Sequence, residues 1–181
     1  MKIAFVGNIG NNFFREVSGI REFSELKPNL FFLQSKYTEE MDLPWGEDSS
    51  LDPDALPNWL FSYSRVGFKD IILGKLKLGI FISRETRYLL KKLEEYDLCV
   101  YSGNAIPISN LVKTKCYIRP TGSDMTVFPT LNYSDYLELY PIYHVAIFEK
   151  LKHFARWWVK KTVYRLASKY ADYVAVDEAS P

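Results

Sequence analysis

The chain has 181 residues, of which 48% are hydrophobic and 16% aromatic, and its formal net charge at pH 7 is +1. This composition excludes an intrinsically disordered chain, and the length suffices for one domain with a hydrophobic core. A net charge so close to zero gives no reason to expect a polyanionic partner, although local clusters of charge must be judged separately.

The N-terminal residues predict no targeting segment. The apolar run in "MKIAFVGNIGNN" is too short for a secretory signal, and no run in the chain approaches the roughly 18 apolar residues of a membrane span. Cys99 and Cys116 lie inside apolar runs without CxxC spacing. That pattern favours buried free thiols over a disulfide or a metal site, and it predicts a cytoplasmic protein.

Five short apolar runs are predicted to be buried strands of one sheet. None of them alternates polar and apolar residues, so each strand is expected to be covered on both faces, as in a parallel sheet between helices. The predicted strands are Lys2–Gly7, Asn29–Gln34, Asp97–Gly103, Lys115–Pro120 and Asp172–Asp177.

Helices are predicted between these strands from their capping residues. Asn11 and Asn12 are good N-cap residues for the first, and Ser83 followed by Thr86 has the spacing of a capping box. The predicted helices are Phe13–Leu26, Ser83–Tyr96 and a long stretch from about Ser134 to Ala171, which should break or kink at Pro141.

The segment 39–60 contains three prolines and no clear period, so it is predicted to be a long loop with one short helix at most. The alternation of strands and helices elsewhere predicts a single α/β domain over residues 1–181. Its fold class is Rossmann-like and doubly wound, with a mainly parallel sheet and helices on both faces.

Polar, glycine-bearing turns follow three of the predicted strands and should lie along one edge of the sheet. Ligands of such folds bind outside the carboxyl ends of the strands, where small residues allow close approach to the backbone and a helix N-terminus offers N–H groups. Any one turn alone would favour a simple strand-to-helix connection, but three together favour a binding site. The candidate substrate-binding residues are Gly7, Asn8, Gly10, Asn11, Gly103, Asn104, Arg119, Gly122 and Ser123.

Several Rossmann-type chemistries do not fit the sequence. The first loop, "GNIGNN", lacks GxGxxG spacing, and the second strand ends in Gln34 and Ser35 without an acid for a ribose. No P-loop and no cluster with metal-ligand spacing is visible, and His144 and His153 are expected on a helix surface. The sequence therefore predicts no cofactor and no metal.

The order of the segments resembles the N-terminal, acceptor-side domain of GT-B-fold glycosyltransferases of the family-4-like group. "KIAFVGNIG" opens that domain, and "EEYDLCVYSG" is similar to its mid-domain strand. "CYIRPTGSD" is similar to the strand that ends in its Gly-Ser-Asp turn, and "SKYADYVAVDEASP" to the helix and strand that close it. The resemblance covers essentially the whole chain.

The resemblance implies transfer of a sugar from a nucleotide-sugar donor to a hydroxyl acceptor, which in many such enzymes is lipid-linked. The second, donor-binding domain of that family has no counterpart here, so this chain alone is expected to be inactive. Many relatives also have a histidine where the turn begins, whereas this sequence has Arg119-Pro120-Thr121. A non-catalytic Rossmann-type binding module and a different nucleotide-dependent enzyme, such as a methyltransferase, are the alternatives.

Asp124 is the candidate catalytic residue that the resemblance implies. At a cleft between domains, its carboxylate would orient or deprotonate the acceptor hydroxyl, and Arg119 would counter a phosphate on donor or acceptor. The alternatives are structural: Asp124 as an Asx turn or helix N-cap, and Arg119 as its ion-pair partner.

The segment 148–170 carries seven Lys and Arg residues, one acid and several aromatic residues. On a helix, the stripe that includes Leu151, Trp158 and Leu166 should pack on the sheet, with Phe154 and Trp157 pointing elsewhere among cations. This predicts peripheral contact with an anionic membrane at the inner face, and the segment 69–81 offers a second patch; a solvated or protein-contacting face is the alternative. Nucleic acid is not favoured. The membrane-surface candidates are Lys150, Phe154, Trp157, Lys161 and Arg165.

Overall fold

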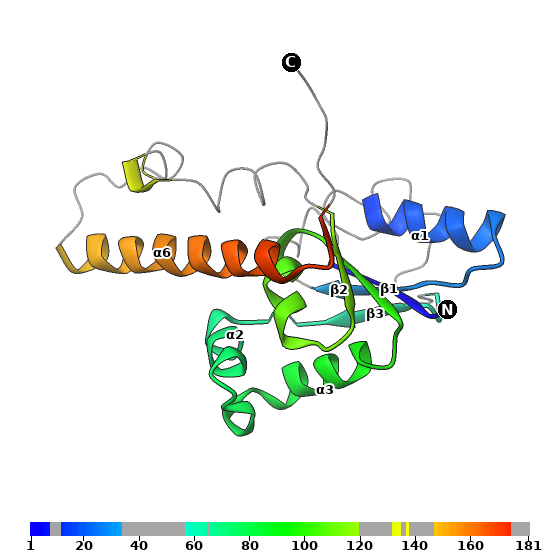
Figure 1. Cartoon of the computed structure of the whole chain (residues 1–181), viewed down its shortest axis with the longest axis horizontal. Coiled ribbons are helices and arrows are strands. Elements are labelled where there is room, and N and C mark those ends of the chain that lie inside the picture. Colours follow the sequence, from blue (N-terminus) through cyan, green and yellow to red (C-terminus); the bar gives the residue numbers. More distant parts are fainter. Residues whose placement is uncertain are drawn as a thin grey trace, which may run out of the picture.

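A computed structural model of the chain describes residues 1–7, 12–33, 57–64, 66–119, 132–134, 137 and 147–174. Figure 1 shows the arrangement of the elements along and across the sheet. In chain order they are β1 (Ile3–Val6), α1 (Asn12–Phe23), β2 (Asn29–Leu33), β3 (Leu60–Tyr63), α2 (Phe68–Lys75), the 3-10 turn η1 (Gly79–Phe81), α3 (Arg84–Leu93), β4 (Leu98–Tyr101), the 3-10 segment η2 (Gly103–Leu111), β5 (Lys115–Ile118), α6 (Ile147–Tyr170) and β6 (Tyr173–Val174).

The six strands form one all-parallel sheet in the order β3-β2-β1-β4-β5-β6. This is the strand order of the Rossmann fold, in which the chain winds outwards in both directions from the central strand. The predicted fold class is therefore confirmed, and all five predicted strands are present at or within their expected ranges.

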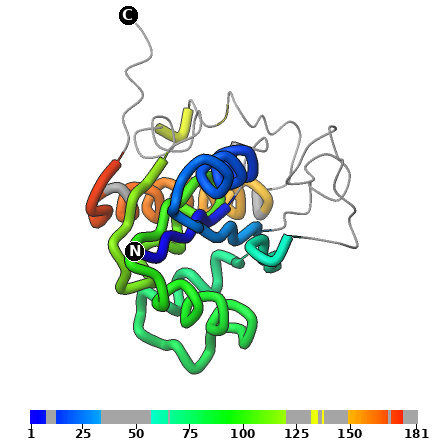
Figure 2. The backbone as a smooth tube through the Cα atoms, turned by 90° about the vertical axis from the view of Figure 1, so that its right-hand side faces the viewer, coloured from blue at the N-terminus to red at the C-terminus, as the bar shows by residue number. Residues whose placement is uncertain are grey.

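Both faces of the sheet are buried along β1, β2 and β4, as the lack of polar alternation predicted, whereas the last strand, β6, is exposed at Tyr173 and Val174. On one face, Phe13 and Val17 of α1 pack on Phe5, Leu30 and Phe32, and the Phe5 and Phe13 rings meet edge-to-face with centroids 5.1 Å apart. The other face carries Ala4, Val6 and Phe31, which alternate with these residues along the strands and pack under α2, α3, η2 and α6. Figure 2 shows α1 and α3 on opposite sides of the strands.

The sequence analysis assigned no structure to four of these elements, β3, α2, η1 and η2. It predicted a loop up to residue 60, whereas β3 begins at Leu60; this edge strand has only four residues, LFSY, and follows a segment with three prolines. It also assigned no structure to α2 or to η2, which contains Pro107. The capping prediction for α3 is confirmed, because the Ser83 hydroxyl accepts a hydrogen bond from the backbone N–H of Thr86 at 3.3 Å.

The predicted orientation of the long helix is wrong. Leu151 and Trp158, expected to pack on the sheet, are 60% and 56% exposed, whereas Val163, Tyr164 and Ala167 are buried. The reason is length: α6 has 24 residues and spans about 36 Å, while a strand of four residues spans only about 13 Å. The first half of α6 therefore reaches past the sheet, as Figure 1 shows, and its apolar side chains find no sheet beneath them.

No helix among the described residues combines the length and the apolar character that crossing a membrane requires.

Candidate functional site

The strand order places a switch point between β1 and β4 at the carboxyl edge of the sheet. These strands are neighbours, with Val6 opposite Tyr101, yet the chain leaves β1 towards β2 on one side and leaves β4 towards β5 on the other. In open α/β sheets, two connections that diverge in this way border a crevice outside the strand ends, and this is where ligands bind.

Gly7 closes β1 in a conformation that few other residues adopt. Its φ is +90°, and its N–H donates to the carbonyl of Phe31 at 2.9 Å. A Cβ at this position would lie 2.5 Å from the carbonyl oxygen of Ser102 on the neighbouring strand end. Glycine is thus required here both by the backbone angle and by the close approach of β4.

The turn after β4 also contains a glycine with positive φ and is held by backbone hydrogen bonds. The Ser102 N–H donates to the Val6 carbonyl at 3.1 Å, and the Ser102 carbonyl accepts from Ala105 at 3.1 Å. Gly103 follows with φ +56°, and its carbonyl accepts a hydrogen bond from the buried hydroxyl of Tyr164 at 3.3 Å. Helix α6 therefore holds the turn through this hydrogen bond, and Asn104, the next residue, is half-buried.

Arg119 lies next to this turn, at the end of β5. Its N–H donates to the Tyr101 carbonyl at 2.9 Å, which fixes its backbone beside the end of β4. Its guanidinium forms an ion pair with Glu16 of α1, and both side chains remain partly exposed. The ion-pair partner suggested by the sequence was Asp124, which lies outside the described residues, so the observed partner is a different carboxylate on another element.

The structure brings Gly7, Gly103, Asn104 and Arg119 to one edge of the sheet, because β1, β4 and β5 are adjacent and parallel. The other predicted residues of this site lie outside the described part of the chain: Asn8, Gly10, Asn11, Gly122, Ser123 and Asp124.

The buried titratable groups in β4 and β5 are not nucleophiles. Cys99 and Cys116 are free thiols, as predicted, and burial raises their pKa to about 12 and about 11. Burial also raises the pKa of Tyr101 well above its usual value. All three are therefore neutral at pH 7 and unsuited to covalent catalysis. Among the described residues, the edge offers backbone groups, Asn104 and an arginine, a set suited to binding.

The membrane-surface candidates on α6 do not share one environment. Lys150, Phe154 and Arg165 are exposed, whereas Trp157 is half-buried and packs against the core together with Tyr133. The ammonium of Lys161 lies 5.2 Å from the centroid of the Trp157 ring, a cation–π contact. The most exposed aromatic side chain of α6 is Tyr170, its last residue, and the next is Trp158, among the side chains that the structure describes.

A second concave site was missed by the sequence analysis. A cavity of about 590 Å³ lies at the opposite, amino edge of the sheet, between α2, η2 and the end of α6. Its lining residues are spread from Gly74 to Asp172 and form no motif, so no local signal could have revealed it. Within the described residues, no cluster of three or more His, Cys, Asp or Glu side chains is close enough to hold a metal ion.

Comparison of the chain with protein-family models, curated proteins and solved structures found no match.

Proposed function

We propose that the carboxyl edge of the sheet binds the acceptor of a sugar-transfer reaction, so that the chain is the acceptor-side domain of a nucleotide-sugar-dependent glycosyltransferase. The observation that supports this most is the switch point between β1 and β4, where Gly7 and Gly103 bring two strand ends together at the carboxyl edge of the sheet. The link from this edge to sugar transfer comes from the order of turns in the sequence.

We propose the following roles for the residues at this edge. The turn at Gly103, with the half-buried Asn104 as its polar side chain, is proposed to contact a sugar or a hydroxyl-bearing acceptor. Arg119 stands beside this turn, held by Glu16, and a phosphate group on donor or acceptor would compete with that carboxylate for the guanidinium. Asp124, in the following turn of the sequence, is proposed to accept the proton of the attacking hydroxyl.

The test is sugar transfer by the complete gene product that carries this chain, using a panel of labelled nucleotide-sugars and a membrane-lipid extract as acceptor. Asp124→Asn should lower turnover about a hundredfold while leaving the melting temperature unchanged. Asp97→Asn is the matched control, because Asp97 accepts a hydrogen bond from the Lys2 N–H at the amino edge, away from the crevice.

Unchanged turnover in Asp124→Asn would contradict the proposed role of that residue. A protein that consumes no nucleotide-sugar, yet binds a small molecule at the crevice in a Gly103-dependent way, would be the non-catalytic module instead. Turnover by residues 1–181 alone would contradict the assignment of this chain to the acceptor side, since donor binding is proposed to need a second domain.

We also propose that the protein contacts anionic membranes peripherally through the outward face of α6. The helix carries seven Lys and Arg residues against Glu149 alone, and Leu151, Phe154 and Trp158 are exposed among them. Clustered cations at an anionic surface contribute about 1 kcal/mol each, and exposed aromatic residues add apolar burial. A second apolar surface, at Leu76, Ile80 and Phe81, is also exposed.

Two adjacent tryptophans make the membrane proposal testable by cosedimentation with anionic vesicles. Trp158→Ser should weaken binding several-fold without loss of stability, because that ring is exposed. Trp157→Ser should instead destabilise the fold, because that ring packs on the core. Replacing Lys150, Lys161 and Arg165 by Glu should abolish sedimentation. Failure of the unmodified protein to bind at low salt would contradict the proposal.

A further inference from the structure

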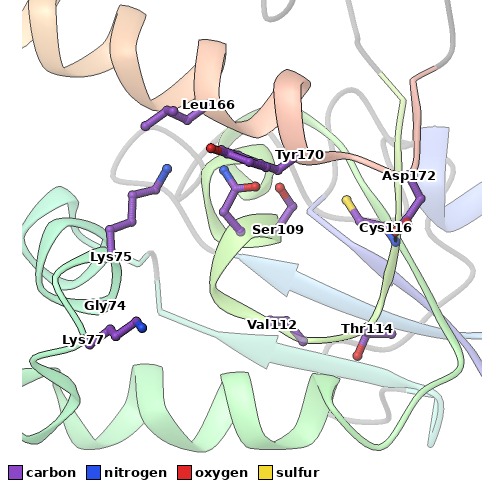
Figure 3. Close-up of a pocket in the computed structure, with 11 residues that line it drawn as sticks. Gly74, Lys75, Lys77, Ser109, Val112, Thr114, Cys116, Leu166, Tyr170 and Asp172 are labelled. Carbon is purple, nitrogen blue, oxygen red and sulfur yellow. Dashed lines mark hydrogen bonds between the residues drawn. The ribbon is translucent and has the colours of Figure 1, made fainter.

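The amino-edge cavity lies on the opposite side of the sheet from the crevice at Gly7. It is bounded by α2 and the turn after it, by η2, by Thr114 and Cys116 at the start of β5, and by Leu166, Tyr170 and Asp172. Figure 3 shows these side chains around the space. Its volume of about 590 Å³ falls in the range of small-molecule sites, about 300–1,000 Å³.

The charges of the lining are separated across the cavity. Lys75 extends from α2 towards Leu166 and Tyr170, and Lys77 extends from the turn after α2, while Asp172 lies at the far side (Figure 3). The Asp172 carboxylate is already engaged, because its Oδ2 accepts the backbone N–H of Cys116 at 2.7 Å. With the Cys116 thiol neutral, the described lining carries two positive charges and one negative charge.

Lys75 is a partly buried cation. Burial lowers the pKa of its ammonium, because the charged form loses contact with water. An anion in the cavity would replace that lost solvation and favour the charged form.

Lys77 occupies a position that usually belongs to glycine. Helix α2 ends in a Schellman motif: Leu78 N–H donates to the Leu73 carbonyl at 2.9 Å, and Lys77 N–H donates to the Gly74 carbonyl at 3.0 Å. Lys77 is the left-handed residue of this motif, with φ +57°, and is the one non-glycine residue with positive φ in the described part of the chain. A lysine there is less stable than glycine, which indicates that its side chain serves another purpose.

The wall at η2 holds a buried hydroxyl beside a thiol. Ser109 is 4% exposed and lines the cavity, and hydrogen bonding between its side chain and the Cys116 thiol opposes the rise that burial causes in the thiol pKa. A thiol is a weak hydrogen-bond partner, so a molecule in the cavity would offer this hydroxyl a stronger one.

We propose that this cavity binds a small organic phosphate, with the phosphate between the Lys75 and Lys77 ammonium groups. Lysine binds phosphate as a point charge, whereas a planar carboxylate is better matched by the fork of an arginine, and the described lining has none. Hydroxyl groups on the body of the ligand would reach the Ser109 and Tyr170 hydroxyls, and the Asp172 carboxylate would accept from them. Because this site lies at the other edge, the inference does not depend on the proposed function.

The phosphate has two possible sources, a soluble metabolite or a lipid headgroup. Exposed apolar residues lie beside the two lysines in the sequence: Leu76 between them, and Leu78 and Ile80 after them. These side chains would contact acyl chains if the phosphate belonged to a lipid. Both sources present the same group to the same two ammonium ions, so one set of variants tests both.

The experiment titrates the ¹⁵N-labelled chain with glycerol 3-phosphate, with glycerol as the uncharged control, and in a second arm with vesicles containing phosphatidate. We expect shifts of the Ser109, Cys116 and Asp172 amide signals by the phosphate and not by glycerol. Lys75→Gln and Lys77→Gly should each raise the dissociation constant about tenfold. Lys69→Gln is the matched control, because Lys69 is exposed on α2 and does not line the cavity.

Lys77→Gly separates binding from folding. Glycine suits the left-handed position, so this variant should unfold at a higher temperature than the unmodified chain while binding the phosphate more weakly. Lysine-dependent binding of glycerol 3-phosphate alone supports a metabolite, and tighter lysine-dependent binding of the vesicles supports a headgroup. The proposal is overturned if about 10 mM glycerol 3-phosphate, well above a millimolar dissociation constant, and the vesicles leave these amides unmoved, or if the two lysine variants bind as the unmodified chain does.

Discussion

The two edges of the sheet differ in what forms a binding surface. At the carboxyl edge the backbones of two strand ends lie in contact, because Gly7 at the end of β1 leaves no room for a side chain beside the Ser102 carbonyl. At the amino edge the surface consists of side chains from four separate segments, which leave a cavity between α2, η2 and α6. The first kind of site depends on one residue type at one position, whereas the second depends on how helices pack.

This difference decides which site a sequence can reveal. A glycine after an apolar run is visible as a local signal, and the parallel fold then determines which edge it joins. A cavity between helices has no such signal, since Lys75 and Asp172 are almost a hundred residues apart. The difference also predicts how each edge responds to substitution, with the largest response at the glycine.

Gly7→Ala should cause the largest loss of stability. The new Cβ would lie 2.5 Å from the Ser102 carbonyl, and φ of +90° is strained for any residue with a side chain. The two effects together should lower the free energy of unfolding by roughly 3 kcal/mol, measured by urea denaturation.

Gly19→Ala is the control for this substitution. Gly19 lies within α1, and apart from its chain neighbours and the backbone of the helix itself, no atom of the described residues lies within 4 Å of a Cβ built there. Alanine should therefore stabilise the helix by about 0.5–1 kcal/mol. Equal effects of the two substitutions would show that the strand ends are not held together as tightly as the structure indicates.

The next largest effect concerns the carboxylate that anchors α2 beside the amino-edge cavity. Asp70 is buried, and the hydroxyls of Ser83 and Thr86 each lie 2.6 Å from its Oδ2. Burial alone would raise the pKa of Asp70, but these hydrogen bonds outweigh it and lower the pKa below the usual value. Asp70→Asn should lower the free energy of unfolding by about 2 kcal/mol at pH 7.

The pH dependence of this effect has a definite sign. Because the pKa is lower in the folded state, the contribution of Asp70 is present above the pKa of the unfolded chain, about 3.9, and is lost as the pH falls through the folded value. The difference between the unmodified chain and Asp70→Asn should therefore shrink below about pH 4 in urea denaturation. A difference that is constant down to acid pH would show that the charge of Asp70 is not what stabilises the contact.

The sequence predicted the parts of the fold that depend on local pattern. The buried strands at Ile3 and Leu98 and the Ser83 cap could be read from apolar runs and capping chemistry, and the common edge of Gly7, Gly103 and Arg119 followed from parallel pairing. The side of α6 that packs on the domain could not be predicted from the sequence, because apolar residues occur on several sides of this helix. Only the limited extent of the sheet determines that Val163 is buried and Trp158 is exposed.

Ion-pair partners that are distant in the sequence could not be predicted either. The sequence offered Asp124, five residues away and outside the described residues, as a partner of Arg119; the partner that the structure shows is Glu16, more than a hundred residues distant. Such a choice depends on the position of α1 over the sheet, which no spacing in the sequence records.

A smaller effect is expected where α6 supports the carboxyl edge. The Tyr164 hydroxyl donates to the Gly103 carbonyl at 3.3 Å in a buried setting. Tyr164→Phe keeps the packing of the ring and should cost about 1 kcal/mol in urea denaturation. Amide exchange near Gly103 should also accelerate, whereas that of Ser109 should not. Acceleration at both positions would mean that the hydroxyl stabilises the domain as a whole.

The smallest effect is expected from the ion pair between Arg119 and Glu16. The two side chains are 44% and 33% exposed, so water and salt screen their attraction, and a double-mutant cycle with Arg119→Gln and Glu16→Gln should give a coupling of at most about 1 kcal/mol.

The effect of this ion pair on ligand binding should be larger than its effect on stability. Glu16→Gln releases the guanidinium beside the crevice, so a phosphate-bearing ligand should bind there more tightly, by about tenfold if the carboxylate competes for the same donors. Isothermal titration with a nucleoside diphosphate compares the two proteins directly, and weaker binding to Glu16→Gln would show that Glu16 orients Arg119 for the ligand.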